Sequence, residues 1–165
     1  MKKQKGFSLI ELLIVVAIIL VVAAIAIPNL MRSKIAANEA SAVASLRVIH
    51  TAQTTYYSTY GLGYAALINL GTPAAGCPGA TSSAACLLDG NLSAGTKSGY
   101  KYTSIASGGA GTTASPNSVF NSTAVPVVPG QTGQDSFCTD GTGVIRRDTT
   151  GVLQPSCPTS GLPPI

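Results

Sequence analysis

An apolar run over residues 7–27 constrains this chain more than any other feature of its sequence. Of these 21 residues only Ser8 and Glu11 are polar. As an α-helix the run is about 31 Å long, which matches the roughly 30 Å hydrocarbon core of a bilayer. The residues ahead of it are basic, with Lys2, Lys3 and Lys5. Positive charge on that side favours a cytoplasmic N-terminus, so the sequence predicts one membrane-spanning helix over residues 7–27.

Glu11 separates three interpretations of this helix. A carboxylate in hydrocarbon costs about 2.5–3.5 kcal/mol and usually has a functional partner. A signal peptide cut after Ala-Ile-Ala at residues 24–26 fits a small-x-small site, but the apolar run is longer than usual for one and contains the glutamate. A plain membrane anchor leaves Glu11 without a partner. Cleavage between Gly6 and Phe7 supplies one, because it creates an α-amino group on Phe7.

After that cleavage Glu11 is the fifth residue of the mature chain, one helical turn from the new amine of Phe7. Its carboxylate also lies near the helix N-terminus, where negative charge is favoured. In a stack of such helices, Glu11 of one copy pairs with the Phe7 amine of its neighbour. Both charges are then buried in an apolar core, which enforces the axial register of the stack.

Residues 5–12, Lys-Gly-Phe-Ser-Leu-Ile-Glu-Leu, resemble the prepilin signature of type IV pilins and type II secretion pseudopilins. The motif is specific, since it combines a basic leader, Gly before the cut, Phe after it and Glu at the fifth mature position. The resemblance implies that a membrane aspartyl prepilin peptidase removes residues 1–6, and that Phe7 is N-methylated. It also implies assembly from a single-pass form in the inner membrane into an extracellular homopolymer, by a separate ATPase and membrane platform.

The helical pattern continues past the apolar run, through residues 28–60, with its end expected near Tyr57 before Gly61 and Gly63. An amphipathic stripe recurs at four- and three-residue steps: Ala42, Leu46, Ile49, Gln53, Tyr56 and Tyr60. The opposite face is expected to be polar, with Ser41, Ser45, Arg47, His50 and Thr54. Pro28 matches the proline that kinks the helix in type IV pilins. The glycine that many pilins have midway along the apolar run is missing here.

Residues 61–165 are rich in Gly, Ser, Thr and Pro, and they predict a small β-rich domain. We expect a loop over residues 61–98. Strand-like runs follow at residues 100–105, 118–128, 136–139 and 144–147, the last two joined by the turn Asp-Gly-Thr-Gly at 140–143. A three- or four-stranded antiparallel sheet packed on the helical stripe gives an α+β fold. A long helix followed by such a meander is also the order of the pilin fold.

The four cysteines, Cys77, Cys86, Cys138 and Cys157, all lie in this β-rich region. An even count in a small exported domain indicates disulfides. Of the three possible pairings we favour 77–86 and 138–157, because each closes a short loop; the second would contribute about 3 kcal/mol. A zinc site is the rival, but no CxxC occurs and the one histidine, His50, is far upstream. The 138–157 loop also resembles the disulfide-bounded C-terminal loop of many pilins.

The positive net charge of +4 comes from residues that flank the apolar run. From residue 35 onward five basic residues balance five acidic ones: Arg47, Lys97, Lys101, Arg146 and Arg147 against Glu39, Asp89, Asp135, Asp140 and Asp148. The charge therefore gives no indication of a nucleic-acid partner. No GxSxG, HExxH or Walker A motif occurs, so we expect neither an enzyme nor a cofactor.

Two further expectations concern single residues. His50 is expected to have a solvated surface role rather than a catalytic one. Asp135, Asp140 and Asp148 are expected to cap turns; a calcium site is the alternative, but their spacing does not fit an EF-hand loop and we expect no metal.

The expected function is a structural one, that of a subunit of a type IV pilus held together by its N-terminal helix. The alternative within the family is the major pseudopilin of a type II secretion system, although the four cysteines favour a pilin. An alternative of another class is a secreted binding module whose signal peptide is removed. Adhesion, motility and DNA uptake all remain open as roles of the filament.

Overall fold

One long helix, α1 (Leu9–Tyr60), occupies most of the first third of the chain. The structure is a computed structural model, and it describes residues 7–72, 76–77, 79–151, 157 and 162–165. The chain forms two compact units, Met1–Lys34 and Ile35–Ile165, so α1 begins in the first and ends in the second. The expected leader at residues 1–6, with the cleavage residue Gly6, lies outside the described residues.

In the first unit, α1 leaves its apolar side chains uncovered. The large apolar side chains from Leu9 to Ile27 are 46–80% exposed. The run forms a helix because leucine and alanine are strong helix formers and it contains no glycine. Most helical stability in proteins comes from packing of the apolar surface, so this surface needs a covering from outside the unit.

Pro28 lies inside α1, and the helix continues on both sides of it. Proline has no N–H, so the carbonyl of Ala24, four residues earlier, loses its usual donor. The Asn29 side chain turns back and donates to the Ile25 carbonyl (Nδ2···O 3.1 Å). Ser33 Oγ donates in the same way to the Asn29 carbonyl at 3.0 Å. The kink expected at Pro28 stays a prediction.

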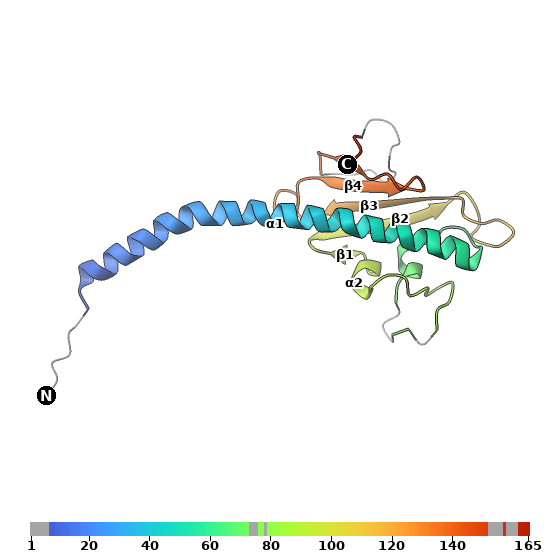
Figure 1. Ribbon diagram of the computed structural model, residues 1–165, viewed down its shortest axis with the longest axis horizontal. Coiled ribbons are helices and arrows are strands. Elements are labelled where there is room, and N and C mark those ends of the chain that lie inside the picture. Colours follow the sequence, from blue (N-terminus) through green and yellow to red (C-terminus); the bar gives the residue numbers. More distant parts are fainter. Residues whose placement is uncertain (1–6, 73–75, 78, 152–156, 158–161) are drawn as a thin grey trace. The chain divides into compact units, whose positions relative to one another are not determined.

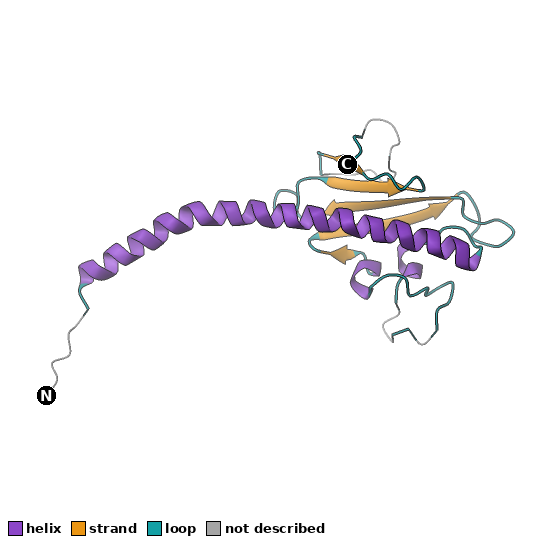
Figure 2. Ribbon diagram, in the orientation of Figure 1, coloured by secondary structure: helices purple, strands orange, loops and turns teal. Residues whose placement is uncertain are grey.

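The described part of the second unit contains an antiparallel sheet of five strands, arranged in chain order (Figure 1). The strands are β1 (Thr96–Lys97), β2 (Tyr100–Ser107), β3 (Val119–Pro126), β4 (Ser136–Asp140) and β5 (Arg146–Asp148). The longest pairing joins β2 to β3, from Tyr100 opposite Pro126 to Ser107 opposite Val119. Figure 2 shows the later part of α1 lying along one face of the sheet. The α+β class predicted from the sequence is confirmed.

The core of the second unit lies between this face of the sheet and the predicted stripe of α1. Five stripe residues are at most 3% exposed, namely Ala42, Leu46, Ile49, Gln53 and Tyr56. Tyr60 closes the stripe half-buried against the core. The sheet contributes Tyr100, Tyr102, Ala124 and Phe137. The prediction that the stripe packs on the sheet is therefore confirmed.

Some boundaries differ from the prediction. α1 ends at Tyr60 rather than Tyr57, and Gly61 follows it with a φ of +65° that glycine adopts easily. The region 61–98, expected to be a loop, holds the short helices η1 (Leu67–Leu70) and α2 (Gly90–Ser93) and the strand β1. β1 raises the strand number to five, above the three or four expected. The last strand lies at 146–148 rather than 144–147. These elements are too short to leave a periodic pattern in the sequence.

The polar face of α1 is narrower than predicted. Ser45 is only 4% exposed. His50 is half-buried, and its ring centroid lies 5.9 Å from that of Phe120 on β3. The expectation that His50 is solvated at the surface was therefore wrong. The sheet covers a wider arc of the helix than the stripe alone, which explains both differences.

Candidate functional site

Phe7 and Glu11 lie where the described chain begins. Phe7 precedes α1, and Glu11 lies in its first turn. Both are exposed, Phe7 to 75%. The Leu12 N–H donates to the Ser8 carbonyl at 3.2 Å and so begins the helical hydrogen bonding. The N–H groups of the first turn have no helical acceptors, and the helix dipole favours a carboxylate there. The structure thus places Glu11 in an electrostatically favourable position, one turn from Phe7.

Glu11 has no ion-pair partner among the residues that the structure describes. The two ion pairs found there, Lys97 with Asp89 and Arg147 with Asp135, both lie in the second unit. Large apolar side chains surround Glu11 along the helix. A carboxylate that is covered together with such a surface needs a positive partner, because an unpaired buried charge is strongly destabilising. No positive group among the described residues meets that need for Glu11.

The apolar part of α1 is long enough to cross a membrane. An 18-residue stretch near its N-terminus is apolar and long enough to span a bilayer. None of that stretch is buried within the described structure. A signal sequence near the N-terminus has the same length and apolar composition. Exposed apolar surface of this extent marks a site of contact with lipid or protein.

Two basic residues follow the apolar run. Arg32 and Lys34 are exposed on α1, beyond Ile27. Long basic side chains near the end of an apolar helix place their charges at the water interface. The apolar surface of the first unit is therefore bounded on the C-terminal side by positive charge.

The β-rich unit is cross-linked by two disulfides, which join Cys77 to Cys86 and Cys138 to Cys157. These are the pairings favoured from the loop lengths. Cys138 belongs to β4, and its partner Cys157 is one of the few described residues of the C-terminal loop. The prolines at 155 and 158 in that loop lie outside the described residues.

Hydrogen bonds also hold the end of the chain on the β5 side of the sheet. The Arg147 N–H donates to the Pro163 carbonyl (3.0 Å), and the Ile165 N–H donates to the Ile145 carbonyl (3.1 Å). Arg146 Nη1 reaches the carbonyl of Leu162 at 3.2 Å. This edge of the sheet is therefore covered by the chain itself.

The three aspartates considered for calcium do not form a common site. Asp140 accepts from the Thr142 N–H at 2.9 Å, and Asp148 accepts from the Thr150 N–H at 2.9 Å, so each caps its own turn. Asp135 instead pairs with Arg147. Among the described residues no group of three potential metal ligands comes together. The turn-capping interpretation holds for Asp140 and Asp148.

Glu39 is a residue whose role the sequence did not indicate. Its Oε1 accepts the backbone N–H groups of Gln134 (2.8 Å) and Asp135 (3.3 Å), and it thereby fixes the segment before β4 to α1. Burial raises the pKa of the Asp135 carboxyl, and the charge of Glu39 raises it further, while Arg147 lowers it. No local pattern reveals this contact, because the partners are about 95 positions apart.

Comparison with known proteins finds a matching family model in the N-terminal segment of the chain. Residues 1–27 match the family model of the prokaryotic N-terminal methylation motif. The chain is 45% identical over 80 residues to the type IV wide pilus major component PilA4 of Thermus thermophilus, covering 45% of this chain and 61% of that protein. It is also 45% identical over 56 residues to the type IV major pilin protein PilA of Myxococcus xanthus, covering 34% of this chain and 26% of that protein.

A type II secretion protein is similar as well. The chain is 33% identical over 79 residues to the type II secretion system core protein G of Aeromonas hydrophila, covering 44% of this chain and 55% of that protein. The matches thus span less than two thirds of each of these relatives. No solved structure matches the chain.

Proposed function

This chain belongs to the family of type IV pilins and type II secretion pseudopilins, and from that premise we propose that it is the structural subunit of a type IV pilus. A long N-terminal helix packed on a small antiparallel sheet, with a disulfide in the C-terminal region, matches the pilin fold. The observation that carries the proposal is the uncovered apolar surface of α1 with one carboxylate, Glu11, in its first turn.

Processing prepares this helix for assembly. A prepilin peptidase cuts between Gly6 and Phe7, and the Phe7 amine is then methylated. The leader removed in this step carries Lys2, Lys3 and Lys5. Its loss removes the positive charges that hold the N-terminus in the cytoplasm, while the apolar helix stays in the inner membrane.

Assembly exchanges one apolar environment for another. In the bilayer, lipid covers the apolar side chains of α1; in the filament, the helices of other copies cover them. An assembly ATPase and a membrane platform move the subunit from one to the other, because a helix of this length does not leave a bilayer spontaneously. Neither environment leaves the apolar surface in water, so the exchange avoids the full cost of exposing it.

The pair of Glu11 with the Phe7 amine of a neighbouring copy sets the register of the helices. Packing between two apolar helices is weakly specific, since many axial offsets bury similar areas. A buried charge pair is different, because an offset leaves both charges unpaired in an apolar core. Glu11 therefore contributes specificity of position more than it contributes net stability.

The second candidate is the major pseudopilin of a type II secretion system. The similarity to core protein G of Aeromonas hydrophila and to that of Escherichia coli, at 33% and 34% identity, supports it. Both functions use the same helix and the same processing. Shearing of intact cells separates them: long surface filaments that contain this chain support the pilus, and their absence during active protein export supports the pseudopilus.

Mass spectrometry of the mature N-terminus tests the proposal as a whole. A chain that begins with N-methyl-Phe7 supports it. A chain that begins near Ile27 is the product expected of a signal peptide, and that result contradicts the proposal and supports a secreted module instead. The measurement needs only the protein purified from its own cells.

A further inference from the structure

One edge of the sheet, along β2, is open. β1 pairs only with Tyr100 and Lys101 of β2, and the Tyr102 N–H then donates to the Gly95 carbonyl at 2.8 Å. Beyond Tyr102, no strand among the described residues lies on this side of β2. The opposite edge of the sheet differs, because residues 162–165 cover β5.

The register of the sheet determines which backbone groups reach this open edge. The Val127 N–H donates to the Gly99 carbonyl at 2.9 Å, so every second residue of β2 from Lys101 onward bonds to β3. Ser104 and Ala106 lie between those residues, and their N–H and C=O groups point away from β3. Neither residue has a backbone hydrogen bond to another described segment on that side. Ser104 is only 6% exposed, and unpaired backbone groups in such a place cost free energy.

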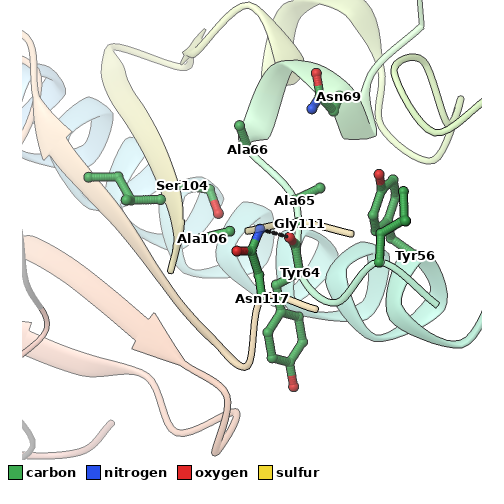
Figure 3. A pocket seen from close by; sticks show the side chains of 11 residues that line it. Tyr56, Tyr64, Ala65, Ala66, Asn69, Ser104, Ala106, Gly111 and Asn117 are labelled. Atoms are coloured by element: carbon green, nitrogen blue, oxygen red, sulfur yellow. Dashed lines mark hydrogen bonds between the residues drawn. The ribbon is translucent and has the colours of Figure 1, made fainter. Parts of the chain in front are cut away.

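A groove of about 350 Å³ opens at this edge, between β2 and the segment that follows α1 (Figure 3). Small residues form much of its wall: Ala65, Ala66, Ala106 and Gly111. Figure 3 shows Asn117 and Asn69 at different parts of the groove. Asn117 Nδ2 donates to the Tyr64 carbonyl at 3.0 Å, and its Oδ1 has no hydrogen-bond partner among the described residues.

The groove has no charged side chain in its lining. A charged group that entered it would lose hydration without gaining a counter-charge, so the lining disfavours such a group. The small wall residues leave space for a peptide backbone next to β2. The unpaired donors and acceptors of Ser104 and Ala106 alternate with the spacing that a further strand requires.

We propose that this groove binds an extended, uncharged peptide segment of a partner molecule, which adds to the sheet as a strand beside β2. Ser104 and Ala106 supply the main-chain hydrogen bonds, and the amide groups of Asn69 and Asn117 bind the peptide at its sides. Binding by strand addition draws its affinity from main-chain hydrogen bonds, and its specificity from the walls of the groove. The inference does not depend on the assignment of the chain as a pilus subunit.

The test is a nuclear magnetic resonance titration of the full-length, ¹⁵N-labelled chain in detergent micelles. The probe is the blocked peptide acetyl-Ala-Thr-Ala-Thr-amide. We expect the Ser104 and Ala106 amides to shift and their hydrogen exchange to slow by about tenfold or more on addition of the peptide. Unchanged shifts and exchange at millimolar peptide overturn the proposal. An equal response to acetyl-Asp-Thr-Asp-Thr-amide, or a response to a neutral monosaccharide alone, also overturns it.

A pair of variants tests the hydrogen bond itself. Ala106→Pro removes an N–H that points away from β3, so the pairing of β2 with β3 is retained. We expect peptide affinity to fall about threefold to tenfold, the effect of one lost hydrogen bond. Thr54→Ala, on the exposed face of α1 and outside the groove, is the control and should bind as the original chain does. Equal affinity of the folded proline variant contradicts the proposal; if that variant does not fold, the exchange rates of the original chain decide.

Discussion

Gln53 and Ser104 meet inside the core, where Gln53 Nε2 donates a hydrogen bond of 2.9 Å to Ser104 Oγ. The same nitrogen donates to the Ala65 carbonyl at 2.6 Å, and Gln53 Oε1 accepts the Ala65 N–H at 2.9 Å. Ser122 Oγ on β3 extends this network to Ser104 at 2.8 Å. The one polar residue of the apolar stripe therefore connects the end of α1, the segment behind it and the sheet.

Gln53→Leu should destabilise the second unit by about 2–4 kcal/mol, even though leucine is apolar and of similar size. The substitution leaves the Ala65 N–H and C=O buried without partners, and unsatisfied buried polar groups cost about 1–3 kcal/mol each. Urea unfolding of the full chain in micelles measures the change. Thr54→Leu is the control, because Thr54 lies on the exposed face of α1. Ala52→Leu would not serve, since Ala52 is buried as well. If both variants unfold at the same urea concentration, the network does not stabilise the core.

The disulfide between Cys138 and Cys157 should stabilise the β-rich unit. Cys138→Ser combined with Cys157→Ser removes the cross-link without leaving a free thiol. We expect a loss of about 3 kcal/mol, since the bond closes a loop of 19 residues in the unfolded chain. Thermal melting with and without reductant measures it. The original chain should melt at a lower temperature in reductant; the double variant still retains the 77–86 bond and should show a smaller change.

Glu39 should control the titration of Asp135. The Glu39 charge raises the pKa of Asp135 in addition to burial, so Glu39→Gln should lower that pKa while keeping an oxygen that accepts from the Gln134 N–H. Carboxyl chemical shifts of Asp135 as a function of pH measure the effect. Glu39→Ala should in addition destabilise the unit by about 1–3 kcal/mol, because two backbone N–H groups lose their acceptor. An Asp135 titration that is identical in Glu39→Gln would show that the two carboxyls do not interact.

Asp89 should give the domain a stability contribution that disappears in acid. The Leu92 N–H, donated to Asp89 Oδ1 at 2.9 Å, and the ammonium of Lys97 lower the pKa of this carboxyl. Because the folded pKa lies below the unfolded value of about 3.9, the contribution is complete above that value and is lost as the pH falls through the folded pKa.

Asp89→Ala removes this cap of α2 and should cost about 1 kcal/mol at pH 7. Melting temperatures of the variant and the original chain should therefore converge as the pH falls below about 4. Lys97→Ala is the matched control. Its ion pair with Asp89 is exposed and should contribute little, so a large effect of that variant would assign the stability to the ion pair instead of the cap.

The parts of the fold that the sequence predicted are those that repeat along the chain. The apolar run of α1 and its stripe through Leu46 and Ile49 extend over many helical turns, so periodicity and length identify them. β1 has two residues and α2 has four, and such elements are set by neighbouring segments that no local pattern reveals. Glu39 and the open edge of β2 were missed for the same reason, since both depend on contacts between segments distant in sequence.

Within the candidate site, spacing was informative because the chemistry is local. Phe7 and Glu11 lie four positions apart, which on a helix is one turn whatever the rest of the chain does. The burial of Ser45 and the position of His50 against Phe120 depend instead on how far the sheet extends around α1. That width is a property of the packed sheet and cannot be inferred from one helix.

Glu11→Ala should separate processing from assembly. The leader and the cleavage residues are unchanged, and the helix becomes more apolar, so the variant should insert in the membrane and mature to N-methyl-Phe7. In the filament, however, the amine of Phe7 would be buried without its partner, and breaking a buried pair in this way costs about 3–5 kcal/mol. Subunit addition should therefore weaken by about a hundredfold or more. Immunoblots of the sheared and membrane fractions measure both outcomes, with Ser8→Ala as a control that changes the other polar residue of the run. Wild-type amounts of Glu11→Ala filament would mean that this carboxylate does not set the register of the helices.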